Sequence, residues 1–212
     1  MMSGMNGMNN LKLIDLSPRL YPGKEKRRLA IRHFVHPQLG THMHDIDIMS
    51  HIGTHIEAPL HYFYPEGKDI TEIPIETFIG ECLTIDLSFL SEGQPITVEA
   101  LERATAKHDL QGKIVILRGP KAENPPYLTG EAANWLVDRK VKMVGIGNTV
   151  KLEAKPGIHD SHKAFLKNEV PILENLINLE KLEEETFLVA LPLNIAGLES
   201  GLVRVIAVTG LT

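Results

Sequence analysis

The stretch His51-Ile-Gly-Thr-His-Ile-Glu-Ala-Pro-Leu-His61 holds three histidines and one carboxylate within eleven residues. Neutral imidazole and carboxylate are preferred ligands of zinc and manganese, so this density of donors indicates a metal site. Gly53 and Pro59 argue against a regular helix, because glycine loosens the backbone and proline lacks an N–H donor. We expect a strand end that runs into a tight loop. The side chains that would converge from this loop are those of His51, His55, Glu57 and His61.

A second interpretation treats these residues as polar surface groups of a histidine-rich chain, since the sequence has 10 histidines. Against it, Gly53-Thr54 and Ala58-Pro59 stand between the candidate ligands, where a loop has to turn tightly. Turn-forming residues in these places favour the metal site.

Length and composition predict one domain, which we assign to residues 11–212. With 212 residues, of which 43% are hydrophobic, the chain is long enough to bury a substantial core. Residues 1–10 are polar and rich in Met, Gly and Asn, and we expect them to be flexible. The net charge is -5, and the densest basic cluster is the short run at residues 24–28. This charge distribution argues against a nucleic-acid partner.

The sequence also lacks segments that would direct it to or across a membrane. Residues 1–10 contain no apolar core of a signal peptide, and no window is long and apolar enough to cross a bilayer. Cys82 is the only cysteine, which excludes an internal disulfide, and its apolar neighbours predict a small buried hydrophobe. We therefore expect a soluble, cytoplasmic protein that acts on a small molecule and has no membrane partner.

Residue patterns predict strands in the first part of the chain, at residues 11–16, 29–35 and 44–49. In the third of these, Ile46 and Ile48 alternate with polar residues, so we expect both side chains to face inward. This strand leads directly to the histidine-rich stretch.

Beyond residue 81, strands and helices alternate. Strands are predicted at residues 82–87, 113–117, 142–146, 186–191 and 202–208. Helices are predicted at residues 98–107 and 130–139, each preceded by a threonine that can cap free N–H groups, Thr97 and Thr129. This order indicates an α/β fold with crossover connections and some parallel pairing.

Two further stretches have chemical meaning. Tyr62-Phe-Tyr64 directly follows His61 and either lines a pocket for a flat substrate or packs in the core. Glu174 lies inside the apolar run Ile172-Leu-Glu-Asn-Leu176. A buried carboxylate is costly unless it is paired, so we expect Glu174 to contact a cation.

The histidine-rich stretch resembles the His-x-Gly-Thr-His-x-Asp-x-Pro-x-His signature of the cyclase/kynurenine formamidase family, with Glu57 in place of the family's Asp. The second match is the Ile172–Leu176 run, with His162 at the family's distance of 12 residues before Glu174. Asn148 stands where the family commonly has an Asp. The resemblance extends from about residue 11 to residue 208.

The resemblance implies a swivelling β/β/α domain, an α/β fold with mixed sheets and flanking helices. It also implies two divalent ions per chain, with zinc preferred and manganese as the alternative. The first ion would be held by His51, His55 and Glu57. The second would be held by Glu57, His162 and Glu174, with Glu57 bridging the two.

The implied activity is metal-dependent hydrolysis of a carbon–nitrogen bond, with metal-activated water as the nucleophile. Arylformamidase chemistry on N-formyl-kynurenine is the named example, and relatives also open cyclic amides. His61 would be the catalytic acid and base, or else a fourth ligand or a structural histidine. A cyclase or lactone hydrolase on the same metal site, and a metal-binding domain without turnover, are the alternative functions. We expect a homodimer or a higher homo-oligomer.

Overall fold

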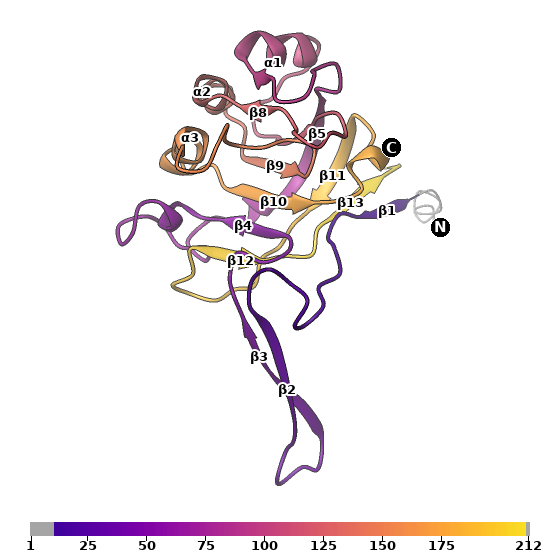
Figure 1. The fold of residues 1–212 in the computed structure, drawn as a ribbon, viewed down its shortest axis with the longest axis vertical. Coiled ribbons are helices and arrows are strands. Elements are labelled where there is room, and N and C mark those ends of the chain that lie inside the picture. Colours follow the sequence, from indigo (N-terminus) through magenta and orange to yellow (C-terminus); the bar gives the residue numbers. More distant parts are fainter. Residues whose placement is uncertain (1–10, 211–212) are drawn as a thin grey trace, which may run out of the picture.

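The computed structural model describes residues 11–210, and its largest feature is a mixed sheet of nine strands (Figure 1). In spatial order the strands are β1 (Lys12–Asp15), β13 (Ile206–Thr209), β11 (Glu185–Val189), β5 (Ile79–Asp86), β7 (Ile114–Arg118), β9 (Met143–Gly147), β10 (Ile172–Leu176), β4 (His55–Glu57) and β12 (Ser200–Leu202). The four strands from β5 to β10 run parallel to their neighbours within this group, and the outer pairings are antiparallel. The predicted α/β class with a mixed sheet is confirmed.

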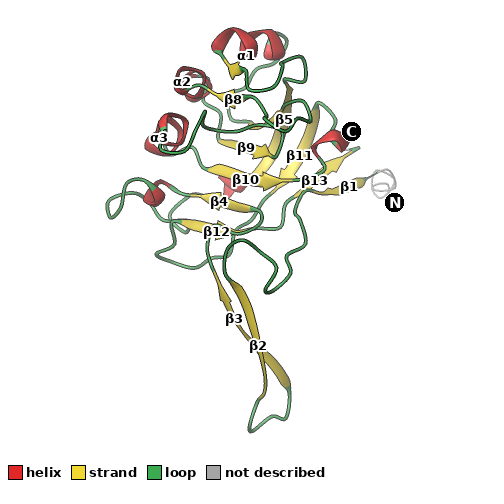
Figure 2. Cartoon of the chain, viewed as in Figure 1, coloured by secondary structure: helices red, strands yellow, loops and turns green. Residues whose placement is uncertain are grey.

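Three helices connect the parallel strands and lie on one face of the sheet (Figure 2). They are α1 (Val98–Thr105), α2 (Gly130–Asp138) and α3 (Asp160–Lys167). The first two begin where the sequence predicts, because Thr97 accepts a hydrogen bond from the Ala100 N–H and Thr129 accepts one from the Ala132 N–H. These caps satisfy N–H groups that the first helical turn leaves free.

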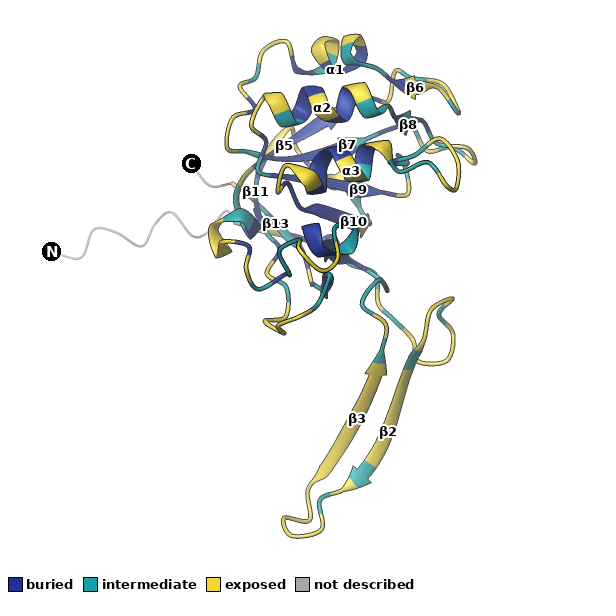
Figure 3. Cartoon of the chain, turned by 90° about the vertical axis from the view of Figure 1, so that its left-hand side faces the viewer, coloured by how far each residue is buried: buried dark blue, intermediate teal, exposed yellow. Residues whose placement is uncertain are grey.

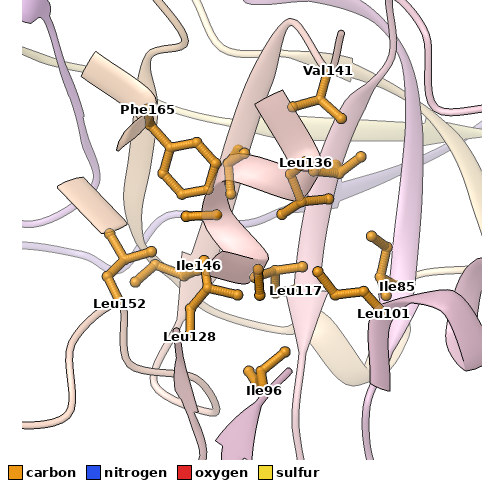
Figure 4. Packing of buried hydrophobic residues seen from close by; sticks show 14 of the residues in the cluster. Ile85, Ile96, Leu101, Leu117, Leu128, Leu136, Val141, Ile146, Leu152 and Phe165 are labelled. Atoms are coloured by element: carbon orange, nitrogen blue, oxygen red, sulfur yellow. The ribbon is translucent and has the colours of Figure 1, made fainter. Parts of the chain in front are cut away.

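Side chains of the parallel strands alternate between two separate cores. Leu117 and Ile146 face the helices and pack with Leu136 and Phe165 (Figure 4). Burying each such aliphatic side chain contributes about 1.5–3 kcal/mol. This core fixes α3, which carries His162, against the sheet.

The opposite face of the sheet encloses a second core, because strands from both edges contribute to it. Ile14 of β1, Ile56 of β4, Leu173 of β10 and Ala207 of β13 belong to one buried cluster. The sheet therefore curls, and β4 is held as an inner strand between β10 and β12. Cys82 lies in this core, as predicted, and burial raises the pKa of its thiol to about 12.

A hairpin of β2 (Leu29–Val35) and β3 (His42–Ile48) projects from the body of the protein (Figure 3). Its two strands pair only with each other. The prediction that Ile46 and Ile48 face inward is therefore wrong: Ile46 is 65% exposed and Ile48 is only partly buried. Alternation of side chains indicates a strand, but it does not reveal whether another element covers one face.

The remaining elements are short. They are the two-stranded pair β6 (Pro95–Ile96) and β8 (Tyr127–Leu128), and the 3-10 helices η1 (Pro59–His61), η2 (Ile75–Phe78) and η3 (Leu179–Lys181). The strand predicted at residues 202–208 is divided into β12 and β13. Arg204, between these two strands, is exposed and pairs with Asp15 of β1. The flexibility predicted for residues 1–10 lies outside the described residues. Among residues 11–210, none of the helices has both the length and the apolar character that a membrane crossing requires.

Candidate metal centre

The register of two strands brings the two chemical stretches of the sequence together. In the antiparallel pair of β4 and β10, Glu174 lies opposite His55, and Ile172 lies opposite Glu57. Residues two apart on a strand point to the same face, so His55 and Glu57 share a face of β4. The nearest approaches of the His55 Nε2 atom are 3.6 Å to Glu174 and 3.7 Å to Glu57.

The backbone fixes the orientation of His55. Its Nδ1 atom lies 2.9 Å from the Gly53 carbonyl oxygen, so Nδ1 carries a proton and Nε2 faces the two carboxylates. Gly53 has a φ of 59°, a conformation that glycine adopts without a steric penalty. This explains why the loop predicted from the sequence requires glycine between the first two histidines.

Glu57 stands at the centre of the cluster and is only 3% exposed. Its Oε1 atom lies 3.0 Å from His51 Nδ1 and 3.7 Å from His61 Nε2. Its Oε2 atom lies 3.7 Å from Nε2 of His162, which α3 brings in from a distant part of the sequence. His162 also reaches within 3.7 Å of Glu174. All six residues proposed from the sequence therefore meet around one carboxylate.

Two groups in residues 11–210 have ligand atoms close enough to hold one ion each. The first is His51, Glu57 and His61, and the second is His55, Glu57 and Glu174. Glu57 belongs to both groups, as a bridging ligand would. The sequence-based prediction places His55 with the first ion and gives His61 a catalytic role. In the structure His61 belongs to the first group and His55 to the second. The assignment of ligands to individual ions stays a prediction.

The donor set fits a divalent ion. Nε2 of His55 and Oε2 of Glu57 are buried and have no hydrogen-bond partner in the described part of the chain. Nε2 of His51 is also buried and forms no hydrogen bond there, although Glu199 lies 3.2 Å away. Orphaned buried polar atoms are costly and require a partner that ordinary packing does not supply. Imidazole nitrogen and carboxylate oxygen together suit zinc or manganese.

Electrostatics reflect the crowding of this cluster. Burial favours a raised pKa for Glu57, but the imidazoles of His51 and His55 beside it outweigh burial and hold the pKa far below its usual range. Burial also opposes protonation of His162, yet the hydrogen bond to Glu153 and the nearby carboxylate of Glu174 raise its pKa to about 9. For His61 burial dominates, and the pKa is lowered. The cluster thus combines an ionised carboxylate with imidazoles of very different basicity.

Glu153 is a member of the site that the sequence interpretation missed. One of its carboxylate oxygens accepts hydrogen bonds from the backbone N–H groups of Ser161 and His162, at 3.0 and 3.1 Å. The same oxygen lies 2.9 Å from His162 Nδ1. Glu153 therefore caps α3 and holds the proton of His162 on Nδ1, which leaves Nε2 free to face the cluster. Nothing in the sequence around Glu153 matches a motif.

Glu199 was also missed. Its Oε1 atom lies 3.2 Å from His51 Nε2 and accepts a hydrogen bond from the Ser50 hydroxyl. The residue follows a loop and precedes β12, whose Ser200 pairs with Glu57 of β4. Long-range pairing of this kind leaves no local spacing in the sequence.

A cavity of about 280 Å³ opens beside the cluster, lined in part by Tyr62, His159 and His162. The Tyr62 hydroxyl lies 2.8 Å from His159 Nδ1, and burial is the main cause that raises the pKa of Tyr62 to about 12. Of the three predicted aromatic residues, only Tyr62 lines this cavity. Phe63 packs against the core and Tyr64 is 79% exposed.

Sequence comparison relates this chain to a family model and to proteins of known name. Residues 14–151 match the Cyclase family model. Kynurenine formamidase from Bordetella petrii is 28% identical over 207 residues, covering 92% of this chain and 97% of its own length. Kynurenine formamidase from Erythrobacter litoralis is 30% identical over 166 residues, covering 74% of this chain and 72% of its own length.

Solved structures agree with this relationship. A potential metal-dependent hydrolase with cyclase activity superposes with a TM-score of 0.75 at 26% identity, covering 93% of this chain and 98% of its own. Isatin hydrolase A from Ralstonia solanacearum shares the fold, with a TM-score of 0.76 at 22% identity over 94% of this chain and 92% of its own. The family resemblance inferred from the two motifs is confirmed, and this chain belongs to the Cyclase family.

Proposed function

We propose that this protein is a metal-dependent hydrolase of a carbon–nitrogen bond in an aryl or cyclic amide. The observation that carries the proposal is the convergence of four imidazoles and the Glu174 carboxylate around Glu57, with buried nitrogen and oxygen atoms that lack partners. Relatives named kynurenine formamidase and a neighbour described as a metal-dependent hydrolase support it.

The residues that would hold the metal are His51, His55, Glu57, His162 and Glu174. A bound divalent ion supplies an activated water and polarises a substrate carbonyl. The protein contributes a rigid arrangement, because β4 and β10 fix three of these side chains in register. Glu153 fixes the tautomer of His162 from the outside of the cluster.

His61 is our candidate for the catalytic acid and base. It lies at the end of η1, is partly buried, and its lowered pKa keeps the imidazole neutral near pH 7. A neutral imidazole can take a proton at Nε2 and pass it to the leaving nitrogen. Its 3.7 Å separation from Glu57 also supports the alternative role of a further ligand.

The cavity beside the cluster supports an aromatic or cyclic substrate of modest size. Tyr62 offers a ring at its wall, and Pro156 and Ile158 add apolar surface. Such a wall suits a flat ring placed next to the scissile amide. N-formyl-kynurenine is our first candidate for the physiological substrate.

The deciding experiment measures metal content and hydrolysis together. Protein purified without added ions would be analysed for zinc and manganese, then assayed on formanilides, cyclic imides and lactones. We expect hydrolysis of at least one amide class, abolished by chelation and restored by the metal. Turnover of lactones alone would favour the ester hydrolase, and bound metal without any turnover would favour a binding domain.

We further propose zinc as the resident metal, two ions per chain, a cytoplasmic location and a homo-oligomer. Exposed apolar side chains on the segment that follows β11 support association with a second copy of the chain, since such groups favour burial; they include Leu191, Leu193 and Ile195. Light scattering coupled to size-exclusion chromatography tests this. We expect at least twice the mass of one chain, and a Leu193→Glu variant closer to the mass of one.

A further inference from the structure

The projecting hairpin contains a second group of histidines that the active site does not use. His33, His36, His42 and His44 account for four of the 10 histidines, although they lie within twelve residues. Three of them are exposed on the paired strands β2 and β3, and His36 lies at the turn. Solvent-exposed strand positions gain nothing from an imidazole through core packing, so this concentration requires another explanation.

The strand register places three of these imidazoles on one face. His33 lies directly opposite His44, and His42 is two residues before His44 on the same strand. Residues two apart, and residues directly opposite each other, share a face of a hairpin. His33 therefore faces two imidazoles of β3, His44 directly opposite and His42 diagonally.

The side chains are already in contact. His33 Nε2 lies 2.8 Å from His42 Nδ1, and the two rings stack with centroids 5.0 Å apart. The centroids of His33 and His44 are 5.2 Å apart. Ligand atoms of the three rings do not converge as tightly as those around Glu57. His44 is exposed, however, so its ring can rotate toward the other two without displacing a packed neighbour.

The charged side chains of the hairpin strands lie on the face opposite the imidazoles. Asp45 and Asp47 alternate with His44 along β3 and so point to the opposite face, where they pair with Arg32 and Arg28. The face with the histidines is left with imidazole nitrogen donors flanked by aliphatic residues. Such a set suits ions that prefer imidazole, zinc and copper among them, and suits poorly those that require oxygen ligands.

A bound ion would also stabilise the pairing of the two hairpin strands. An isolated two-stranded hairpin is only marginally stable in water, and this one has no third strand to support it. Ligands on both strands would let an ion cross-link β2 to β3. A ligand that binds only the paired form raises the ratio of paired to open hairpin by a factor of one plus its free concentration divided by its dissociation constant.

We propose that His33, His42 and His44 form a zinc-binding site on the hairpin, separate from the centre around Glu57, which cross-links the two strands. His33 is the central ligand, since it contacts both other rings. The site does not depend on the proposed hydrolase activity, because none of its residues belongs to that centre.

Zinc content per chain provides the first test. The full-length protein and its His33→Ala and His44→Ala variants would be dialysed against one buffer of fixed free zinc and analysed for zinc. We expect each variant to contain one zinc per chain less than the wild type, with amide hydrolysis unchanged. The matched control is His36→Ala, which removes an imidazole from the same hairpin at the turn, where its ring accepts backbone N–H groups of Gln38 and Leu39.

Equal zinc contents in all four proteins would overturn the proposal. So would a loss in His36→Ala as large as the loss in His33→Ala. Substitutions at such exposed positions usually change stability little, so the variants should fold.

Limited proteolysis tests the cross-link independently. Trypsin can cleave after Arg32, within β2, when the hairpin opens. Zinc at ten times its dissociation constant should slow this cleavage about elevenfold in the wild type, following the binding polynomial. His33→Ala should show no such protection at the same zinc concentration, which also controls for effects on trypsin itself. Equal cleavage rates with and without zinc in the wild type would overturn the cross-link.

Discussion

Glu174 of β10 lies opposite His55 of β4, and their side chains approach to 3.6 Å although a long segment of sequence separates them. This single pairing joins the two motifs from which the site was inferred. It follows from topology, since β10 is the last of the parallel strands and β4 adds to its free edge in the antiparallel sense. The carboxylate that is unusual in an apolar strand therefore points at the histidine-rich strand.

His61→Ala separates proton transfer from metal binding. If His61 is the acid and base, the variant should keep its metal but lose about 10²–10⁴-fold in turnover, the usual contribution of a positioned proton carrier. Elemental analysis and steady-state kinetics on the same preparation provide the measurement. His108→Ala is a suitable control, because His108 pairs with Glu184, outside the cluster. Loss of metal with turnover would instead make His61 a ligand.

Glu153→Gln tests control of the His162 tautomer. Glutamine keeps the size of the side chain but can also donate to Nδ1, so the imidazole is no longer held in one form. We expect metal affinity to fall about 10–100-fold, the usual effect of removing such an outer partner, with the fold retained. Competition with a chromogenic chelator measures the affinity. Glu131→Gln, an exposed first-turn position on α2, should be silent.

The metal-stripped protein should lose stability as pH rises. Burial opposes protonation of His162, but the hydrogen bond to Glu153 and the nearby carboxylate of Glu174 raise its folded pKa to about 9, against about 6.5 when unfolded. The folded state thus binds more protons between these values, so the free energy of unfolding falls with pH, by on the order of 3 kcal/mol. The pKa of His55 is raised as well and acts in the same direction.

Urea unfolding of chelator-treated protein between pH 6.5 and pH 9 measures this slope. A His162→Gln variant should show a flatter dependence over the same window. A free energy of unfolding that stays constant or rises across it would contradict the assignment of the proton to His162. With metal bound, the imidazole has to be neutral, so metal binding near pH 7 should release protons.

The sequence predicted the features that local residue patterns determine. Thr97 and Thr129 mark helix starts, and the spacing of the histidine-rich stretch marks donors that share one loop and strand. Glu153 and Glu199 could not be found this way, because each reaches its histidine only through the folded sheet. Ile46 was misplaced for a related reason: its alternation was real, but no third strand covers it. The grouping of ligands around each ion depends on side-chain rotation, which spacing does not determine.

Glu57 gives the sharpest test of the site, since both ligand groups contain it. Glu57→Asp restores the carboxylate usual in the family and should keep two ions per chain. Glu57→Gln should lose at least one ion, because a neutral amide neither balances two divalent cations nor bridges them well. The amide would also leave His55 beside a group that no longer accepts as an anion, so the pKa of His55 should fall. Metal stoichiometry per chain, measured alongside activity, decides between these outcomes. Two ions retained at full activity in the Gln variant would remove Glu57 from the metal chemistry, whereas a loss in both variants would show that side-chain length, and not charge alone, sets the bridge.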